Sequence, residues 1–185
     1  MRIFIAGATG RVAKCVIKNL TADGHNVYCG SRHADSLTET EMIKPVYFDL
    51  HFSKNEMAEI IKNIDAVYFL AGSRGKDLLQ TDAFGTVKLM QACEQVGVKR
   101  FVILSSIFAL EPEKWVEEES LKNITNYNIA KFFADHYLVT NTDLDYTIIQ
   151  RRFSKREKAQ AKSKSILSTT VLTRFPMWQG CWQVC

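Results

Sequence analysis

Residues 2–13 of this 185-residue chain read RIFIAGATGRVA. The apolar start of this stretch predicts a short buried strand, and the small residues after it predict a tight turn. Apolar residues then recur at positions 12, 13, 16, 17 and 20, the spacing of one helix face. A strand, a glycine-rich turn and a helix in this order are the context in which a G-x-x-G-x-x-A string predicts a dinucleotide site.

Three small residues of this turn have separate roles in such a site. Gly7 permits the backbone angles of a tight turn, and Gly10 lets a pyrophosphate approach the backbone. Ala13 is small enough for the helix to pack closely against the strand. The helix N-terminus then directs free N–H groups and a partial positive charge at the phosphates. A plain strand-to-helix turn is the alternative, and the flanking elements favour the dinucleotide site.

The composition, 46% hydrophobic and 24% charged, is that of a globular protein, and the length predicts a single folded core. No apolar run is long enough for a membrane span, and a strand begins at residue 2, so we expect neither membrane association nor a signal peptide. The five cysteines form no C-x-x-C pair and no metal-ligand spacing. We expect free, buried thiols at positions 15, 29 and 93 in a reducing cytoplasm, and no metal.

The net charge of +4 is unevenly distributed. Residues 151–185 contain eight Lys or Arg and one Glu, a net charge of +7, which leaves −3 for residues 1–150. A basic tail can bind polyanions, but the slightly acidic body of the chain does not favour them. We therefore expect a small-molecule substrate, rather than nucleic acid, as the partner.

Strand and helix patterns alternate along the first 150 residues. Strands are expected over residues 2–6, 25–30, 45–50, 65–71 and 101–106, and helices after residue 10, over 54–63, over 77–96 and from 127 onward. This alternation is typical of an α/β fold with a doubly wound parallel sheet and helices on both faces. Because ligands of such sheets bind at the carboxyl ends of the strands, residues at those ends are the candidate binding residues.

Arg32 follows the second predicted strand, at the position that selects the cofactor in a dinucleotide fold. An acid there hydrogen-bonds the ribose hydroxyls of NAD, whereas an arginine accommodates the 2′-phosphate of NADP. Gly30-Ser31-Arg32 contains no acid, and the guanidinium offers a fork of donors to a phosphate. We therefore expect NADP(H) to be favoured over NAD(H), with a solvated surface arginine as the alternative.

The ends of the third and fourth predicted strands supply further candidates. Asp49 is expected either to accept a hydrogen bond from the adenine amino group or to cap the following helix. Ala71 and Gly72 are small and leave room for the cofactor ribose and nicotinamide, although a plain glycine-serine loop has the same composition.

Tyr127 and Lys131 stand four residues apart at the start of the last predicted helix, and so lie on one face. A free phenol has a pKa of about 10, and a nearby ammonium lowers it by stabilising the phenolate. Such a tyrosine can exchange a proton with a substrate oxygen during hydride transfer. The same spacing also occurs where the tyrosine simply packs, so this interpretation depends on the nucleotide turn upstream.

Seven motifs stand in order along residues 1–150, namely Gly7-Ala8-Thr9-Gly10-Arg11-Val12, Gly30-Ser31-Arg32, Asp49-Leu50, Ala71-Gly72, GVKRFVILSS at 97–106, Tyr127-x-x-x-Lys131 and DLDYTII at 143–149. Together they resemble the atypical short-chain dehydrogenase/reductase family, in particular its small NAD(P)-binding oxidoreductases. The resemblance implies a Rossmann fold whose cofactor lies on Gly7, Thr9, Gly10, Arg11, Val12, Arg32, Asp49, Leu50, Ala71 and Gly72. It also implies that Lys131 contacts the nicotinamide ribose and that Tyr127 is the acid.

Ser105 and Ser106 end the fifth predicted strand and complete the candidate catalytic set. In catalytic members of the wider family the active serine follows this pair, and here that position is Ile107, which cannot donate a hydrogen bond. Ser105 or Ser106 is the substitute, but strand alternation is expected to send their side chains to opposite faces. The resemblance also implies that atypical members often bind cofactor with weak or unknown turnover.

The resemblance ends at Arg151, where the family continues with Pro-Gly and this chain reads RRF. Residues 154–165 are basic and nearly free of large apolar side chains, and residues 175–182 contain two tryptophans without a clear period. We divide the chain into an NAD(P)-binding Rossmann domain, 1–150, and a basic, family-unlike tail, 151–185, so that the C-terminal part of the sheet is truncated or aberrant. A frameshift near codon 150 is our hypothesis, and a genuine divergent tail is the alternative.

The sequence thus predicts an NAD(P)-binding oxidoreductase that uses NADPH to reduce a small carbonyl or quinone-like substrate, with Tyr127 as the proton donor. One alternative is a redox-sensing protein that binds NAD(P) without turnover. Another is an inactive fragment that keeps the nucleotide half but lacks a substrate pocket. The sequence predicts neither the particular substrate nor the oligomeric state.

Overall fold

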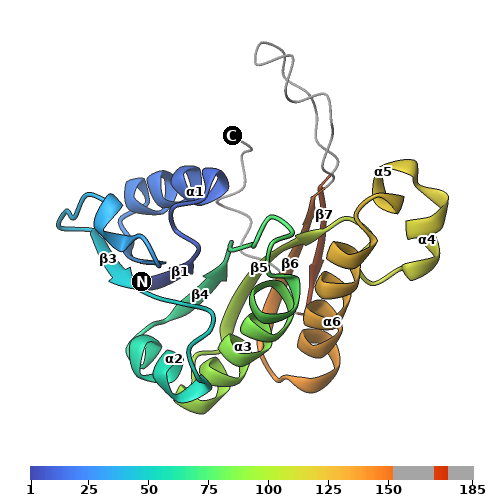
Figure 1. Ribbon diagram of the computed structural model, residues 1–185. Coiled ribbons are helices and arrows are strands. Elements are labelled where there is room, and N and C mark those ends of the chain that lie inside the picture. Colours follow the sequence, from blue (N-terminus) through green and yellow to red (C-terminus); the bar gives the residue numbers. More distant parts are fainter. Residues whose placement is uncertain (152–168, 175–185) are drawn as a thin grey trace, which may run out of the picture.

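The computed structural model describes residues 1–151 and 169–174. The strands are β1 (Arg2–Ala6), β2 (Asn26–Ser31), β3 (Ile43–Tyr47), β4 (Ala66–Phe69), β5 (Arg100–Ser106), β6 (Asp145–Arg151) and β7 (Thr169–Thr173). They form one sheet in the order β3-β2-β1-β4-β5-β6-β7 (Figure 1). The first six strands are parallel, and β7 pairs antiparallel with β6. The expected doubly wound sheet is confirmed, with its change of direction between β1 and β4.

Helices cover both faces of this sheet. They are α1 (Arg11–Ala22), η1 (Ala34–Ser36), α2 (Lys54–Ile61), η2 (Leu78–Phe84), α3 (Gly85–Val96), α4 (Pro112–Glu117), α5 (Glu119–Lys122) and α6 (Thr125–Asn141). α1 packs on one face, whereas α2, α3 and α6 pack on the other (Figure 1). Over the described ranges, no helix combines the length and apolar character needed to cross a membrane.

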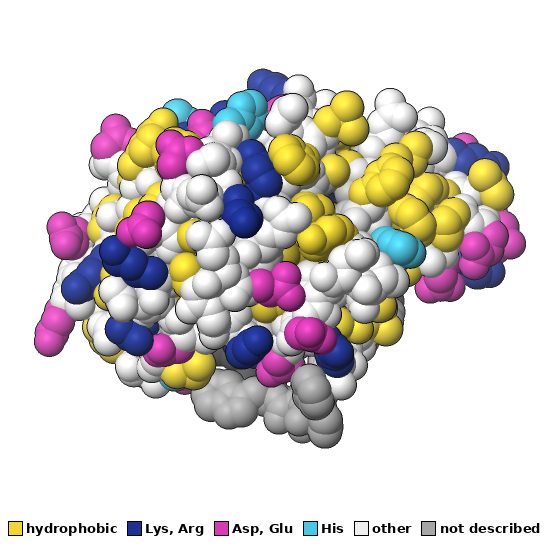
Figure 2. All heavy atoms as spheres, turned by 90° about the horizontal axis from the view of Figure 1, so that it is seen from below, with side chains coloured by type: hydrophobic (Ala, Val, Ile, Leu, Met, Phe, Trp, Pro, Cys, Tyr) yellow, Lys and Arg dark blue, Asp and Glu magenta, His cyan; other side chains and the backbone are white. Residues whose placement is uncertain are grey.

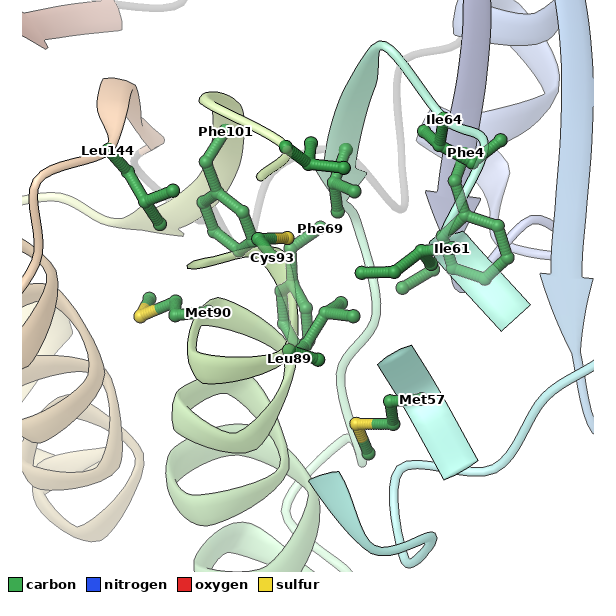
Figure 3. Packing of buried hydrophobic residues seen from close by; sticks show 14 of the residues in the cluster. Phe4, Met57, Ile61, Ile64, Phe69, Leu89, Met90, Cys93, Phe101 and Leu144 are labelled. Carbon is green, nitrogen blue, oxygen red and sulfur yellow. The ribbon is translucent and has the colours of Figure 1, made fainter. Parts of the chain in front are cut away.

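Alternate residues of β1 divide the core into two clusters. Phe4 and Ala6 point into a cluster with α2, α3 and α6, part of which Figure 3 shows around Phe69. Ile3 and Ile5 point the other way and pack against α1 and β2. This alternation explains why the strand reads as a continuous apolar run, since a parallel strand at the centre of a sheet is buried on both faces.

Three cysteines are free thiols in regular elements. Cys29 of β2 and Cys93 of α3 are buried, as expected, whereas Cys15 of α1 is only half-buried. Burial raises the pKa of the Cys29 thiol to about 11 and raises that of Cys93 still further, so both stay protonated at neutral pH. Cys181 and Cys185 lie outside the described residues.

Two elements differ from their predicted bounds beside the site. The third strand covers residues 43–47 rather than 45–50, so Asp49 and Leu50 belong to the loop after it. The helix expected over 77–96 is divided into the π-helical η2 and the regular α3. The two meet at Gly85, where a Cβ would lie 2.7 Å from the Gln80 carbonyl oxygen and 2.9 Å from the Leu50 Cβ. The β3 loop and the wide turn of η2 therefore approach so closely that only glycine fits.

The sheet continues beyond the predicted boundary at residue 150. β6 ends at Arg151, and β7 lies within the predicted tail. β7 runs antiparallel to β6, unlike the other six strands, and such an edge strand is common in sheets that are otherwise parallel. The basic run at 154–165 and the segment 175–182 lie outside the described residues. The domain boundary and the frameshift hypothesis stay predictions.

Figure 2 shows the face that lies at the bottom of Figure 1. Acidic and basic side chains are interspersed over it, and hydrophobic side chains gather in one part of it. The exposed large hydrophobic residues of the helices include Phe84 of η2 and Phe133 and Val139 of α6. Among the side chains coloured in this view, no continuous basic patch of the kind that binds a polyanion is present.

Candidate functional site

The glycine turn lies between the end of β1 and the start of α1. Gly7 has a φ of +88°, and its N–H donates to the Gly30 carbonyl oxygen at 2.9 Å. A Cβ at Gly7 would lie 2.6 Å from the Ala71 Cα, so the turn lies directly against the chain that follows β4. Gly10 precedes α1, and no side chain caps the first turn of this helix. The N–H groups of that turn are the donors that an anion would bind.

A hydroxyl pair joins the turn to the end of β2. Thr9 Oγ1 lies 3.2 Å from Ser31 Oγ, and the His33 N–H donates to the same Ser31 oxygen at 3.0 Å. Ser31 is thereby buried and fixed, whereas the next residue, Arg32, is exposed. The end of β2 thus presents the Arg32 side chain beside the glycine turn.

The carboxylate of Asp49 closes a local turn after β3. Its Oδ1 accepts from the His51 N–H at 3.0 Å. The prediction that Asp49 caps the next helix is wrong, because Ser53 stands immediately before α2 and forms a capping box with Glu56. Leu50 is buried beneath Gly85, with its own Cβ in the way of any side chain there. The expected contact of Asp49 with adenine stays a prediction.

His51 and Asp77 connect two loops at this edge of the sheet. His51 Nε2 lies 2.6 Å from Asp77 Oδ2, and the Thr81 hydroxyl donates to the same oxygen at 2.6 Å. The hydrogen bonds from Thr81 and His51 lower the pKa of Asp77 below its ordinary value. Sequence reasoning missed this pair, because His51 lies between predicted elements and Asp77, 26 residues later, begins a predicted helix, so no local spacing relates them.

The loop after β4 lies over a buried carboxylate. The Ser73 N–H donates to Asp82 Oδ2 at 3.0 Å, and a Cβ at Gly72 would lie 3.3 Å from Asp82 Oδ1. Asp82 belongs to η2 and is fully buried. The predicted cofactor residues Ala71 and Gly72 therefore sit between the glycine turn on one side and Asp82 on the other.

Tyr127 and Lys131 lie on one face of α6, as predicted. The Lys131 ammonium lies over the Tyr127 ring at 5.7 Å and over the Phe69 ring at 5.4 Å, measured to the ring centroids. It donates a long hydrogen bond of 3.5 Å to the Leu104 carbonyl oxygen and is 3.9 Å from Asp82 Oδ1. Lys131 is only 1% exposed, so the expected contact with the nicotinamide ribose requires this side chain to be uncovered.

A cavity of about 390 Å³ opens beside Tyr127. It is lined by Gly75, Leu78 and residues 122–127, from the loop after β4, the start of η2 and the connection between α5 and α6. The volume lies in the range of small-molecule sites in proteins. Tyr127 therefore lines this cavity, and its ring also lies under the ammonium of the buried Lys131.

The two serines at the end of β5 both reach α6. Ser105 Oγ donates to Asp135 Oδ2 at 2.5 Å, and Ser106 Oγ donates to Asn128 Oδ1 at 3.2 Å. Both hydroxyls reach α6, at Asp135 and at Asn128, although strand alternation predicts that the two serines point to opposite faces. Both serines are buried, so both hold α6 against β5 in this structure.

Ile107 occupies the position at which catalytic members of the family are expected to have a serine, which can donate a hydrogen bond. It is buried in a small cluster with Trp115 of α4 and Leu121 of α5. This cluster packs the short helices against the beginning of α6, with partly buried aromatic residues around it. Ile107 thus contributes packing beneath the cavity wall rather than a hydrogen bond.

Asp135 is the second buried acid that sequence reasoning missed. It stands one helical turn after Lys131, and this i, i+4 spacing was the signal that could have identified it. Burial raises the pKa of Asp135 to about 7, against the opposing effects of the Ser105 hydrogen bond and the Lys131 charge. The site therefore contains a carboxyl group that titrates near neutral pH.

The structure thus arranges the candidates in two groups that share one loop. The first group surrounds the glycine turn, with Arg11 exposed and Val12 half-buried in the first turn of α1. The second surrounds Tyr127 and Lys131. The loop 71–73 belongs to both, since it contacts Gly7 at one end and Asp82 at the other.

Comparison with known proteins agrees with this arrangement. A family described as NAD(P)H-binding matches residues 7–170, which include every candidate residue. UPF0659 protein YMR090W of Saccharomyces cerevisiae is 33% identical over 168 residues, covering 81% of this chain and 68% of that protein. The uncharacterized sugar epimerase YhfK of Bacillus subtilis is 32% identical over 158 residues, covering 81% of this chain and 71% of that protein.

A solved structure shows the same likeness. The oxidoreductase ylbE from Lactococcus lactis superposes with a TM-score of 0.77 at 46% sequence identity. The superposition covers 81% of this chain and 68% of that one. The similarity thus extends over most of the sheet and its helices.

Proposed function

This chain belongs to the NAD(P)H-binding family, as an atypical short-chain dehydrogenase/reductase-like Rossmann protein, and on this premise we propose that it is an NADPH-dependent oxidoreductase. We propose a small carbonyl or quinone-like compound as its substrate. The observation that carries this proposal is the position of Tyr127, which lines a cavity of about 390 Å³ and has the Lys131 ammonium over its ring. A phenol between a cavity and an ammonium is suited to donate a proton to a bound oxygen.

The edge that holds the glycine turn suits a dinucleotide. The uncapped first turn of α1, after Gly10, offers N–H donors to a pyrophosphate. Gly7 packs directly against Ala71, which follows β4, so a side chain at position 7 would not fit between the turn and this segment. The bound cofactor would supply a hydride, and the chain's own residues orient the substrate and deliver the proton.

Arg32 supports the preference for NADPH. It is exposed directly after β2, and no carboxylate among the described residues forms an ion pair with it. Its guanidinium is thus available to a 2′-phosphate, which it would bind through two parallel hydrogen bonds.

In the proposed reaction the substrate oxygen lies in the cavity beside Tyr127. The carbonyl carbon gains the hydride and the oxygen gains the proton of the Tyr127 hydroxyl, so the C=O double bond becomes a C–O single bond with new C–H and O–H bonds. A bound nicotinamide would supply this hydride and so act as the reductant, and the Lys131 ammonium would stabilise the phenolate left on Tyr127. Ser105 serves a different purpose here, because it is buried behind Lys131 and bonded to Asp135.

The test is NADPH consumption with a panel of small aldehydes, ketones and quinones. We expect turnover by the unaltered chain and a loss of at least ~100-fold in Tyr127→Phe, the scale of general acid catalysis. Thermal stabilisation by NADPH should be the same in both proteins. Tyr47→Phe is the matched control, because Tyr47 is exposed on β3. Unchanged turnover in Tyr127→Phe contradicts the proposed acid.

A second candidate function is cofactor sensing without turnover. It is favoured by Ile107 in the donor position and by the burial of Lys131, which is 1% exposed. This alternative predicts thermal stabilisation by NADPH together with no NADPH consumption over the whole carbonyl panel. An inactive fragment would in addition lack any response of its conformation to the cofactor.

Two further features of the structure support proposals on the binding partner and on the cellular compartment. We propose a small molecule rather than nucleic acid as the partner, because the cavity beside Tyr127 has the volume of a small-molecule site. We propose the cytoplasm as its location, because Cys29 and Cys93 are free thiols, which a reducing compartment preserves.

A further inference from the structure

A buried ion pair joins Asp82 of η2 to Lys131 of α6. Asp82 Oδ1 lies 3.9 Å from the Lys131 Nζ, and the two side chains are 0% and 1% exposed. Every other ion pair between described residues joins side chains that are each at least 28% exposed. Because burying two charges costs about as much as their attraction returns, stability alone does not explain a pair at this depth.

The Lys131 ammonium has little else to hold it in place. It can donate three hydrogen bonds, but within the described chain it donates one, of 3.5 Å, to the Leu104 carbonyl oxygen. Asp135, one turn further along α6, accepts from the Ser105 hydroxyl instead. Asp82 is therefore the carboxylate that pairs with Lys131 in the part of the chain that the structure describes.

Asp82 also lies against the loop that is expected to face the cofactor. The Ser73 N–H donates to its Oδ2 at 3.0 Å, and a Cβ at Gly72 would lie 3.3 Å from its Oδ1. This Oδ1 is buried and accepts no hydrogen bond from any described residue. It thus faces the Gly72 backbone on one side and the Lys131 ammonium on the other, and it draws the ammonium toward loop 71–73.

The backbone at Asp82 is itself unusual. Asp82 belongs to the π-helical η2, and π-helical turns are rare and occur frequently at functional sites. The Thr86 hydroxyl of α3 donates to the Asp82 carbonyl oxygen at 2.8 Å. The main chain is thus tied to α3, while the carboxylate reaches Lys131 on α6.

We propose that Asp82 is a positioning residue that holds the Lys131 ammonium toward loop 71–73, so that Lys131 contacts the ribose next to the nicotinamide. The inference rests on the proposed function and adds a residue that acts on the cofactor through Lys131. Without the Asp82 carboxylate, the ammonium keeps only its long hydrogen bond to the Leu104 carbonyl oxygen of β5. A lysine drawn toward the strand in this way is displaced from loop 71–73.

The test compares two ligands that differ at the nicotinamide end. NADPH contains the ribose that Lys131 is expected to contact, whereas adenosine 2′,5′-bisphosphate contains only the adenine end with its 2′-phosphate. We expect Asp82→Asn to weaken NADPH binding about tenfold, the scale of one charged hydrogen bond, and to leave binding of the bisphosphate unchanged. Asparagine keeps the size of aspartate and an oxygen for the Ser73 N–H, so the variant removes mainly the charge. Isothermal titration calorimetry measures both affinities.

A double-mutant cycle shows whether Asp82 acts through Lys131. Lys131→Met removes the ammonium, so adding Asp82→Asn to it should not weaken NADPH binding further. Removing both charges of a buried pair is less costly than removing one. The double variant should therefore melt at a higher temperature than Asp82→Asn.

Two more variants complete the design. Asp77→Asn is the matched control, because Asp77 immediately precedes η2 but its carboxylate is bonded to His51 and Thr81. Any change in affinity in this control should be the same for both ligands. Asp82→Glu keeps the charge and moves it by one methylene, so it also predicts a selective loss of NADPH binding and serves as the test if Asp82→Asn does not fold.

The binding measurements decide the inference without a turnover assay. A loss that is selective for NADPH and that disappears in the Lys131→Met background supports it. Unchanged binding in Asp82→Asn, or equal losses for the two ligands, overturns it. A loss that persists in the Lys131→Met background also overturns it, because Asp82 would then act without Lys131.

Failure of the proposed function gives a different pattern. If the unaltered chain binds NADPH but consumes none with any carbonyl compound, the proposed oxidoreductase is contradicted, and the comparison of the two ligands still decides the role of Asp82. If the unaltered chain binds neither ligand, both proposals are contradicted.

Discussion

Gly7 and Ala71 approach each other so closely that a Cβ on Gly7 would lie 2.6 Å from the Ala71 Cα. Gly7 also has a φ of +88°, which L side chains rarely adopt. The two constraints act together at the turn that the nucleotide is expected to contact. The turn is therefore built for close packing of β1 against β4 as well as for ligand access.

This contact makes Gly7→Ala more costly than an ordinary glycine substitution. We expect it to lower the free energy of unfolding by about 2–4 kcal/mol through strain and displacement of the loop at Ala71, and to abolish thermal stabilisation by NADPH. The matched control is Gly24→Ala, where φ is +80° but nothing lies within 4 Å of the new Cβ, so only the conformational cost of about 1 kcal/mol remains. Equal losses in urea denaturation would contradict the role of the Ala71 contact.

Arg32 should discriminate between the two nicotinamide cofactors. Arg32→Ala removes charged hydrogen bonds to a 2′-phosphate, and we expect NADPH to bind about 2–4 kcal/mol more weakly while NADH binding changes little. Isothermal titration calorimetry with both cofactors measures the two changes. Lys18→Ala, which removes an exposed cation from the same region of sequence on α1, is the control. Similar losses for NADPH and NADH would exclude Arg32 from the phosphate.

The His51–Asp77 pair is expected to make the stability of the fold depend on pH in the acid range. Hydrogen bonds from Thr81 and His51 lower the pKa of Asp77, so this carboxylate stabilises the fold above its ordinary pKa and loses that contribution as the pH falls through the lowered value. Asp77→Asn should therefore destabilise the protein near neutral pH by less than about 1 kcal/mol, as exposed pairs do. The difference from the unaltered chain should vanish in acid. Urea midpoints measure it, with exposed Asp35→Asn as the control; a difference independent of pH would refute the pair's contribution.

The buried carboxyl group of Asp135 is expected to give the opposite effect, a stability that falls as the pH rises. Burial raises its pKa from the ordinary 3.8 to about 7, so the folded state holds this proton more tightly than the unfolded state does. Stability should fall as the pH rises between these two values and level off above about 7, by a total of about 4 kcal/mol from this group.

Asp135→Asn carries no titrating carboxyl at this position and should lack that decline. Urea denaturation at a series of pH values across the window measures the slope in both proteins. The same slope in Asp135→Asn and in the unaltered chain would show that the buried carboxyl is not its source.

Local pattern in the sequence predicted most of the architecture. The apolar run before Gly7, the helix period after Gly10 and the alternation of strands with helices each occupy a short window, and each depends on the neighbours of a residue along the chain. The same holds for Tyr127 and Lys131, because four residues of helix place two side chains on one face. The bounds of β3 and the division at Gly85 were not predicted, since they depend on how closely the β3 loop approaches η2.

The charge environment of the site was decided by the tertiary structure. Ser105 and Asp135 are 30 residues apart and Lys131 and Asp82 are 49 apart, and each pair meets only because β5, α6 and η2 pack together. No period in the sequence relates Ser105 to Asp135 or Lys131 to Asp82, so neither contact could be predicted before the fold was known. The sequence by itself determined that a tyrosine and a lysine share a helix face and that a glycine-rich turn joins the first strand to the first helix. Packing decided which charges surround them, because electrostatic interactions depend on distance and burial in space.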